Sequence, residues 1–217
     1  MNIRNSMPLI MSTLLIGLIC IFSLLRLNQD GIWKNTIINF DIVISVIYVV
    51  WMIFESKISK KELSQGNNTS DFGTCELYAI GQAGIFLSAL WFNPIWSRPN
   101  ILHLIGLIMF ILGILLRLRA IRTLGKYYSH IVREVDGHKI IKSGPYGYIR
   151  HPAYTGMILA NAGITVFFFN TVTCLIFLFV LIPAIILRII IEEKTLYKIE
   201  GYSDYAKSRK RLLPVIW

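Results

Sequence analysis

Long apolar runs alternate with short polar stretches along almost the whole chain. The apolar runs cover residues 8–27, 36–54, 75–96, 101–118 and 152–191. A helix needs about 20 consecutive apolar residues to cross a bilayer, so each of the first four runs predicts one transmembrane helix. The fifth run is too long for a single span, and Asn170 near its middle predicts a tight helical hairpin. The pattern therefore predicts an all-α integral membrane protein with about six transmembrane helices.

The polar positions divide the chain into two parts. Residues 1–119 hold the first four apolar runs, with a polar linker at 55–74 between the second and the third. Residues 120–151 are basic and aromatic and contain no long apolar run, while the hairpin and a charged tail at 192–217 follow them. We therefore expect N-terminal transmembrane helices over 1–119 and a functional core over 120–217.

Composition and charge add the orientation of the chain in the membrane. Only 16% of the residues are charged, whereas a soluble domain has about 25%. The net charge of +10 would suggest nucleic-acid binding in a soluble protein, but Lys and Arg gather in the cytoplasmic loops of membrane proteins. With six spans and cytoplasmic termini, only Arg26, Lys34 and Arg98 of the 22 Lys and Arg lie outside. The sequence thus predicts that both termini are cytoplasmic and that no nucleic acid is bound.

The segment 138–156 concentrates His, Gly, Pro and Tyr just ahead of the predicted hairpin. A Gly-Pro pair within it predicts a turn, and Pro152 suits the first turn of the following helix. Arg150 and His151 then stand directly before a helix N-terminus, where free backbone N–H groups favour an anion such as a carboxylate. The alternative is an interfacial anchor, in which Tyr and Arg lie among the lipid headgroups. Anchoring predicts this composition but not this dense order of residues.

A second polar feature follows at the end of the hairpin, where Arg188 and Glu192 stand four residues apart. Residues at this spacing share one face of a helix, and Glu193 points elsewhere. The alternative is that these charged side chains simply snorkel to water at the membrane boundary. Because the hairpin brings them to the same end of the bundle as residues 138–156, we expect them to face a common site.

Together the two features resemble the isoprenylcysteine carboxyl methyltransferase family. The residues that carry the likeness are 138–156, Glu192, Glu193, Tyr202, Tyr205 and Pro214. The likeness covers roughly residues 120–217, and phospholipid N-methyltransferases share its broader pattern. The resemblance implies a cytoplasmic pocket for S-adenosylmethionine between the two features. Since the chain has no GxGxxG motif, the site of an ordinary soluble methyltransferase is not expected.

The resemblance also implies which residues form that pocket. The cofactor-binding residues that it implies are His138, Lys139, Ile140, Ile141, Tyr146, His151, Pro152, Ala153, Tyr154 and Glu192. By the same likeness, Arg188 is the catalytic residue on the side of the methyl acceptor. The three cysteines show no metal-ligand spacing, so no metal site is expected.

The resemblance implies methyl transfer from S-adenosylmethionine to a lipophilic acceptor that enters from the surrounding membrane lipids. A carboxylate acceptor, on isoprenylcysteine or another lipid-like molecule, is already anionic, so Arg188 has only to orient it by paired hydrogen bonds. An amine on a phospholipid headgroup would need a base, for which His130 and Glu193 are candidates. The other hypotheses are an NADPH-dependent sterol-reductase-like enzyme and a non-catalytic membrane scaffold. The sequence leaves the oligomeric state open.

Overall fold

The computed structural model of the chain describes residues 3–30, 36–62, 73–92, 100–129, 140–213 and 217. In these ranges the chain forms helices and no strand. The longer helices are α1 (Ile3–Asp30), α2 (Thr36–Glu62), α3 (Thr74–Trp91), α4 (Ile101–Leu124), α5 (Pro152–Phe167) and α7 (Ile182–Leu196). The shorter ones are η1 (Gly125–Tyr127), η2 (Gly144–Gly147), α6 (Thr171–Ile176), η3 (Phe177–Leu181) and α8 (Tyr202–Ser208). The π-helical η3 joins α6 and α7 into one continuous helix.

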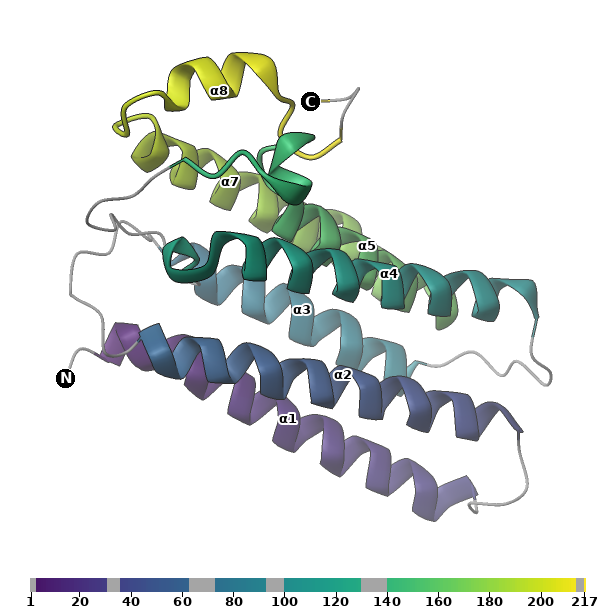
Figure 1. Cartoon of the computed structure of the whole chain (residues 1–217). Helices are drawn as coiled ribbons and strands as arrows, with labels where there is room; N and C mark the ends of the chain where they lie inside the picture. Colours follow the sequence, from purple (N-terminus) through teal and green to yellow (C-terminus); the bar gives the residue numbers. More distant parts are fainter. Residues whose placement is uncertain (1–2, 31–35, 63–72, 93–99, 130–139, 214–216) are drawn as a thin grey trace.

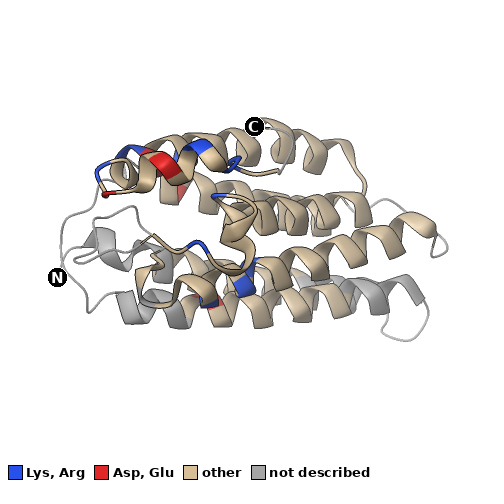
Figure 2. Cartoon of the chain, turned by 45° about the horizontal axis from the view of Figure 1, so that its top comes forward, with Lys and Arg blue, Asp and Glu red and all other residues tan. Residues whose placement is uncertain are grey.

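Helices α1 to α5 run side by side as a bundle, and α8 lies at one end of it together with the C-terminus (Figure 1). Helices α2 and α3 pack on α1, α4 packs along α5, and the continuous α6–α7 helix packs on α3. Among the described residues, the Lys, Arg, Asp and Glu positions gather toward the end where α8 lies (Figure 2). At the opposite end, the last turn of α3, the first turn of α4 and the last turn of α5 contain no Asp, Glu, Lys or Arg. Among the turns compared, the charged residues thus lie at the α8 end, hereafter the polar end of the bundle.

Aromatic side chains fill the centre of the bundle. Tyr48 and Trp51 on α2, Phe86 on α3 and Phe110 on α4 are all almost completely buried. The ring of Tyr48 stacks on that of Phe86, with the ring centroids 4.0 Å apart. Large apolar side chains also cover the outer surface of α4 and of the α6–α7 helix. Such an extended apolar exterior suits contact with lipid rather than with water.

Helices α4 and α5 lie so close together that their backbones are in contact. A Cβ atom added at Gly113 would lie 2.3 Å from the backbone N of Ala160, and one at Gly156 would lie 2.7 Å from the backbone N of Arg117. Glycine is therefore needed at both positions, as at small-residue interfaces between membrane helices. The contact holds the first turns of α5 beside Arg117, at the polar end of α4.

Among the described residues, two helices are long and apolar enough to cross a membrane, namely Ile101–Leu124 and the continuous helix Thr171–Leu196. The number of about six spans stays a prediction. The predicted break at Asn170 is confirmed, because this residue caps α6 and its side-chain oxygen accepts a hydrogen bond from the backbone N of Thr173 at 2.9 Å. The two arms of the hairpin then take different neighbours, since α5 packs mainly on α4 and the α6–α7 arm mainly on α3.

The prediction of a polar linker at 55–74 is wrong in its first part. Helix α2 continues to Glu62, and Glu55 is only 5% exposed. The physical reason is an ion pair with a residue of α4, described below, which allows a carboxylate to enter the bundle. Helix α4 likewise continues to Leu124, across the boundary expected at position 119.

Candidate active site

A pocket opens at the polar end of the bundle, among α3, α4, α5, α7 and α8. The empty space in it, counting the open space at its mouth, is about 900 Å³. The lining includes most of the predicted site residues: Ile140, Ile141, Tyr146, His151, Ala153, Tyr154, Arg188 and Glu192. Pro152 is buried in the first turn of α5 and does not line the pocket. His138 and Lys139 lie outside the described residues.

Arg188 and Glu192 are joined through a residue of another helix, Tyr154 on α5. Nε of Arg188 donates a hydrogen bond to Oη of Tyr154 at 2.8 Å, and this hydroxyl donates to Oε2 of Glu192 at 2.7 Å. Nη1 of Arg188 also donates to Oγ1 of Thr74 on α3, at 3.3 Å. Arg188 is only 3% exposed, so the alternative of an arginine that snorkels to water is wrong. Three helices therefore hold one guanidinium group at the pocket.

Glu193 turns away from the pocket into a cluster of basic side chains. Its Oε1 lies 2.7 Å from Nη1 of Arg150 and 3.1 Å from Nε2 of His151. Its Oε2 accepts a hydrogen bond from Nε of Arg211 at 2.8 Å. The expectation that Glu192 and Glu193 point in different directions is confirmed. Both oxygens of Glu193 are engaged, which argues against its role as a general base.

The C-terminal tail occupies the backbone just ahead of α5. The N–H of Arg150 donates to the carbonyl oxygen of Lys210 at 2.8 Å, and the N–H of His151 donates to that of Arg211 at 2.9 Å. These two N–H groups are therefore engaged by the tail and are not available to an anion. No local pattern in the sequence signals this pairing, because it joins segments that only the tertiary fold brings together.

Several tyrosines line the pocket, among them Tyr146 on η2 and Tyr202 and Tyr205 on α8. Oη of Tyr205 donates a hydrogen bond to the backbone oxygen of Tyr146 at 2.8 Å. Burial raises the pKa of Tyr205 to about 12 and raises the pKa values of Tyr146 and Tyr202 well above the ordinary tyrosine value. All three hydroxyls are therefore neutral at physiological pH, so they offer hydrogen-bond donors and ring faces but no negative charge.

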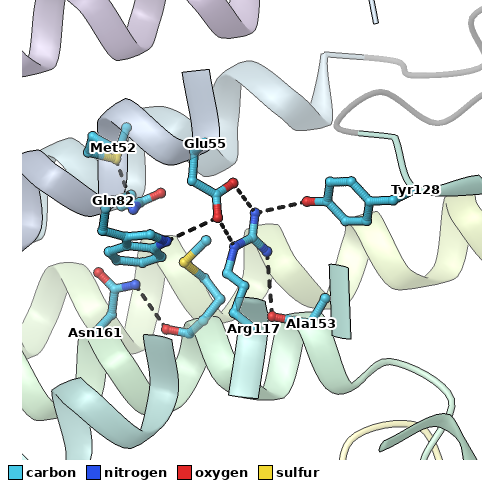
Figure 3. A network of polar contacts seen from close by, with 9 residues as sticks. Met52, Glu55, Gln82, Arg117, Tyr128, Ala153 and Asn161 are labelled. Carbon is cyan, nitrogen blue, oxygen red and sulfur yellow. Dashed lines mark hydrogen bonds and ion pairs between the residues drawn. The ribbon is translucent and has the colours of Figure 1, made fainter. Parts of the chain in front are cut away.

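Arg117 on α4 also lines the pocket, although the sequence analysis did not single it out. Its Nε and Nη2 donate to the two carboxylate oxygens of Glu55, at 2.6 and 2.8 Å (Figure 3). Nη2 also donates to Oη of Tyr128 at 3.0 Å, and Nη1 lies 3.5 Å from the backbone oxygen of Ala153. The only sequence signal for Arg117 was its place as a charged residue near the end of an apolar run. Its partner Glu55 stands 62 positions away in the sequence.

The lining fits S-adenosylmethionine, the cofactor that the family resemblance implies. Glu192 offers a carboxylate to a cationic group, and the tyrosine rings offer faces on which a purine base can stack. Oη of Tyr202 and Nε of Arg150 are buried and have no hydrogen-bond partner among the described residues. Since buried polar groups normally find partners, these two atoms in the lining suit a ligand that carries polar groups of its own.

Residues 105–198 match the isoprenylcysteine carboxyl methyltransferase (ICMT) family. The probable protein-S-isoprenylcysteine O-methyltransferase of Oryza sativa subsp. indica is 34% identical over 116 residues, which cover 52% of this chain and 61% of that protein. The protein-S-isoprenylcysteine O-methyltransferase of Saccharomyces cerevisiae is 36% identical over 111 residues, which cover 50% of this chain and 46% of the yeast protein. The aligned part thus spans about half the length of these curated relatives. The resemblance inferred from the motifs is confirmed.

The fold is also similar to that of a solved structure, the eukaryotic intramembrane Ras methyltransferase ICMT. The two share a TM-score of 0.58 and 22% sequence identity, over 93% of this chain and 74% of the other. The likeness supports an all-helical fold of the ICMT type. It extends over more of the chain than the family match, which holds Arg117, Tyr154, Arg188 and Glu192 but not Glu55.

Proposed function

We propose that the chain transfers a methyl group from S-adenosylmethionine to the carboxylate of a lipophilic acceptor, an isoprenylcysteine or another lipid-like acid. The observation that carries this proposal is the buried arrangement of Arg188, Tyr154 and Glu192, which sets a cation and an anion close together at one pocket. The names of the relatives, protein-S-isoprenylcysteine O-methyltransferases, support the same reaction.

In this proposal the cofactor lies against the residues that the resemblance implied. Glu192 binds its positively charged amino-acid end, and the backbone of 138–141 contacts it along one side. Tyr146 and the segment 151–154 complete the pocket. The proximity of Tyr154 and Glu192, and the position of Ile140, Ile141 and Tyr146 in the same lining, support these roles.

The residues of the chain have mainly to align the two reactants, because S-adenosylmethionine supplies a methyl group that its sulfonium already activates. An arginine has five N–H donors in a planar fork that matches a carboxylate. Tyr154 and Thr74 each accept a hydrogen bond from Arg188 and so hold its guanidinium in one orientation. Arg188 can then orient the acceptor carboxylate, and the burial of the site removes water from that nucleophile.

Methylation of an amine is less well supported by the geometry. An amine acceptor loses a proton during transfer and needs a base to take it. The two oxygens of Glu193 are engaged by Arg150, His151 and Arg211. The other candidate base, His130, lies outside the described residues. Carboxyl O-methylation is therefore the reaction that the site supports best.

We propose further that the pocket and both termini face the cytoplasm and that the acceptor enters from the bilayer. The distribution of Lys and Arg along the sequence supports this orientation. The gathering of charged side chains at the pocket end of the bundle (Figure 2) is consistent with it. Apolar lining residues such as Leu124 and Leu196 suit a lipophilic acceptor.

The proposal is tested first by calorimetric titration of the purified, detergent-solubilised chain with S-adenosylhomocysteine and, separately, with NADPH. We expect saturable binding of S-adenosylhomocysteine alone. Binding of NADPH alone would indicate the reductase, and binding of neither by the folded protein would indicate the scaffold. Transfer of a labelled methyl group is then measured to a farnesylated cysteine and to phosphatidylethanolamine, with product expected only from the first.

Two variants separate the roles in this assay. We expect Glu192→Ala to abolish binding of S-adenosylhomocysteine, because the anionic partner of the cofactor is lost. We expect Arg188→Ala to keep nearly the full affinity for S-adenosylhomocysteine while methyl transfer is lost. Retained affinity in the first variant would remove Glu192 from the pocket, and equal loss of binding and transfer in the second would contradict the acceptor-side role of Arg188.

A further inference from the structure

A buried ion pair joins α2, a helix outside the family match, to the wall of the pocket. Both partners are almost fully buried, Glu55 on α2 and Arg117 on α4. Arg117 meets the carboxylate with two bonds, Nε to Oε1 at 2.6 Å and Nη2 to Oε2 at 2.8 Å. Nε1 of Trp51 donates a further hydrogen bond to Oε1 at 3.0 Å. A bidentate pair of this kind fixes the plane of the guanidinium as well as its position.

The fixed guanidinium reaches two other segments of the chain, and both line the pocket (Figure 3). One is the stretch after η1, where Oη of Tyr128 accepts a hydrogen bond from Nη2 of Arg117 at 3.0 Å. The other is the first turn of α5, where the backbone oxygen of Ala153 lies 3.5 Å from Nη1. Arg117 therefore connects Glu55 to these two parts of the lining.

Stability alone does not account for this pair. The cost of removing two charges from water offsets most of their attraction, so apolar residues of the same volume usually stabilise a fold at least as well. The loss of only one partner, by contrast, leaves a buried charge unpaired and is strongly destabilising. The distinctive contribution of the Glu55–Arg117 pair is thus orientation: it orients groups in the pocket lining.

We propose that Glu55 is a positioning residue of the cofactor pocket, which acts through Arg117 to hold Tyr128 and Ala153 in the geometry that binds S-adenosylmethionine. The inference rests on the proposed function for the identity of the ligand. It assigns the N-terminal helices a part in the site, although Glu55 does not line this pocket itself.

The test compares full-length, detergent-solubilised variants by two measurements, the Kd for S-adenosylhomocysteine from calorimetry and the melting temperature. The variants are Glu55→Gln, the double variant Glu55→Gln/Arg117→Met, and Tyr128→Phe. The matched control is Ser88→Ala, which removes a buried hydroxyl that shares a hydrogen bond with Thr173 at 2.9 Å and does not line the pocket.

We expect Glu55→Gln to lower the melting temperature and to weaken S-adenosylhomocysteine binding by about tenfold or more, the equivalent of one hydrogen bond to a charged group. The double variant removes both charges, so it should regain thermal stability but not affinity. Tyr128→Phe should weaken binding by about tenfold with little change in melting temperature. Ser88→Ala should lower only the melting temperature.

Recovery of both stability and affinity in the double variant would overturn the inference, since it would leave the pair a purely structural role. Wild-type affinity in Tyr128→Phe would overturn it as well, and this variant carries the test if Glu55→Gln does not fold. Failure of the wild-type chain to bind S-adenosylhomocysteine would instead refute the proposed function, so the two failures are distinguishable.

Discussion

The hydroxyl of Tyr154 is a single group whose removal tests the arrangement at the centre of the site. It accepts a hydrogen bond from Arg188 at 2.8 Å and donates one to Glu192 at 2.7 Å. Tyr154→Phe removes both bonds and keeps the ring, so the packing of α5 is preserved. Without the hydroxyl, Arg188 and Glu192 are also able to pair directly, because they stand four residues apart on one helix face. That pairing would turn the guanidinium away from the acceptor.

The expected size of the effect follows from these bonds. A hydrogen bond to a charged group contributes about 1.5–3 kcal/mol. If the misplaced guanidinium of Arg188 loses one such hydrogen bond to the acceptor in the transition state, kcat/KM for methyl transfer falls by about 10- to 150-fold. The melting temperature should change little by comparison, since the ring still fills its place in the core.

The assay is the initial rate of methyl transfer to a farnesylated cysteine at saturating S-adenosylmethionine, together with the Kd for S-adenosylhomocysteine. Tyr148→Phe is the control. It removes the same hydroxyl from a tyrosine that lies outside the site and is 74% exposed. A Tyr154→Phe variant with kcat/KM within about twofold of wild type, a difference worth less than one ordinary hydrogen bond, would refute the reasoning.

Two further predictions concern the fold and its orientation. Gly113→Ala places a Cβ 2.3 Å from the backbone N of Ala160 and should destabilise the chain by about 1–3 kcal/mol, seen as a lower melting temperature in detergent. Gly17→Ala, where nothing lies within 4 Å of the added Cβ, should leave the melting temperature unchanged or slightly higher, and equal behaviour of the two variants would contradict the close packing of α4 on α5. A reporter fused after Trp217 should report a cytoplasmic position, and an extracytoplasmic signal would contradict the proposed orientation.

Several parts of the structure follow from signals that act within one or two helical turns. Pro152 begins α5 as predicted, because its fixed φ and missing N–H suit a first turn. Asn170 interrupts the helix within the apolar run 152–191, because its side chain caps the next helix, α6. The spacing of Arg188 and Glu192 places both at the pocket.

Other parts are not visible in any local pattern. Glu55 looks like the start of a polar linker in the sequence, yet it is buried and continues α2. Arg150 looks like an anion-binding residue before a helix, yet its backbone N–H pairs with the tail and its side chain with Glu193. In each case the partner comes from a distant part of the chain.

The sequence by itself determined that the chain is helical, that α5 begins at Pro152, that the hairpin breaks at Asn170, and that Arg188 and Glu192 share one helix face. Hydropathy, proline and helical spacing suffice for these features, because they depend on a residue and its near neighbours. Only the tertiary structure decided that Tyr154 stands between Arg188 and Glu192, and that Glu55 holds Arg117 at the pocket. Those contacts depend on how helices pack, and the close approach of α4 and α5 at their glycines is what sets that packing.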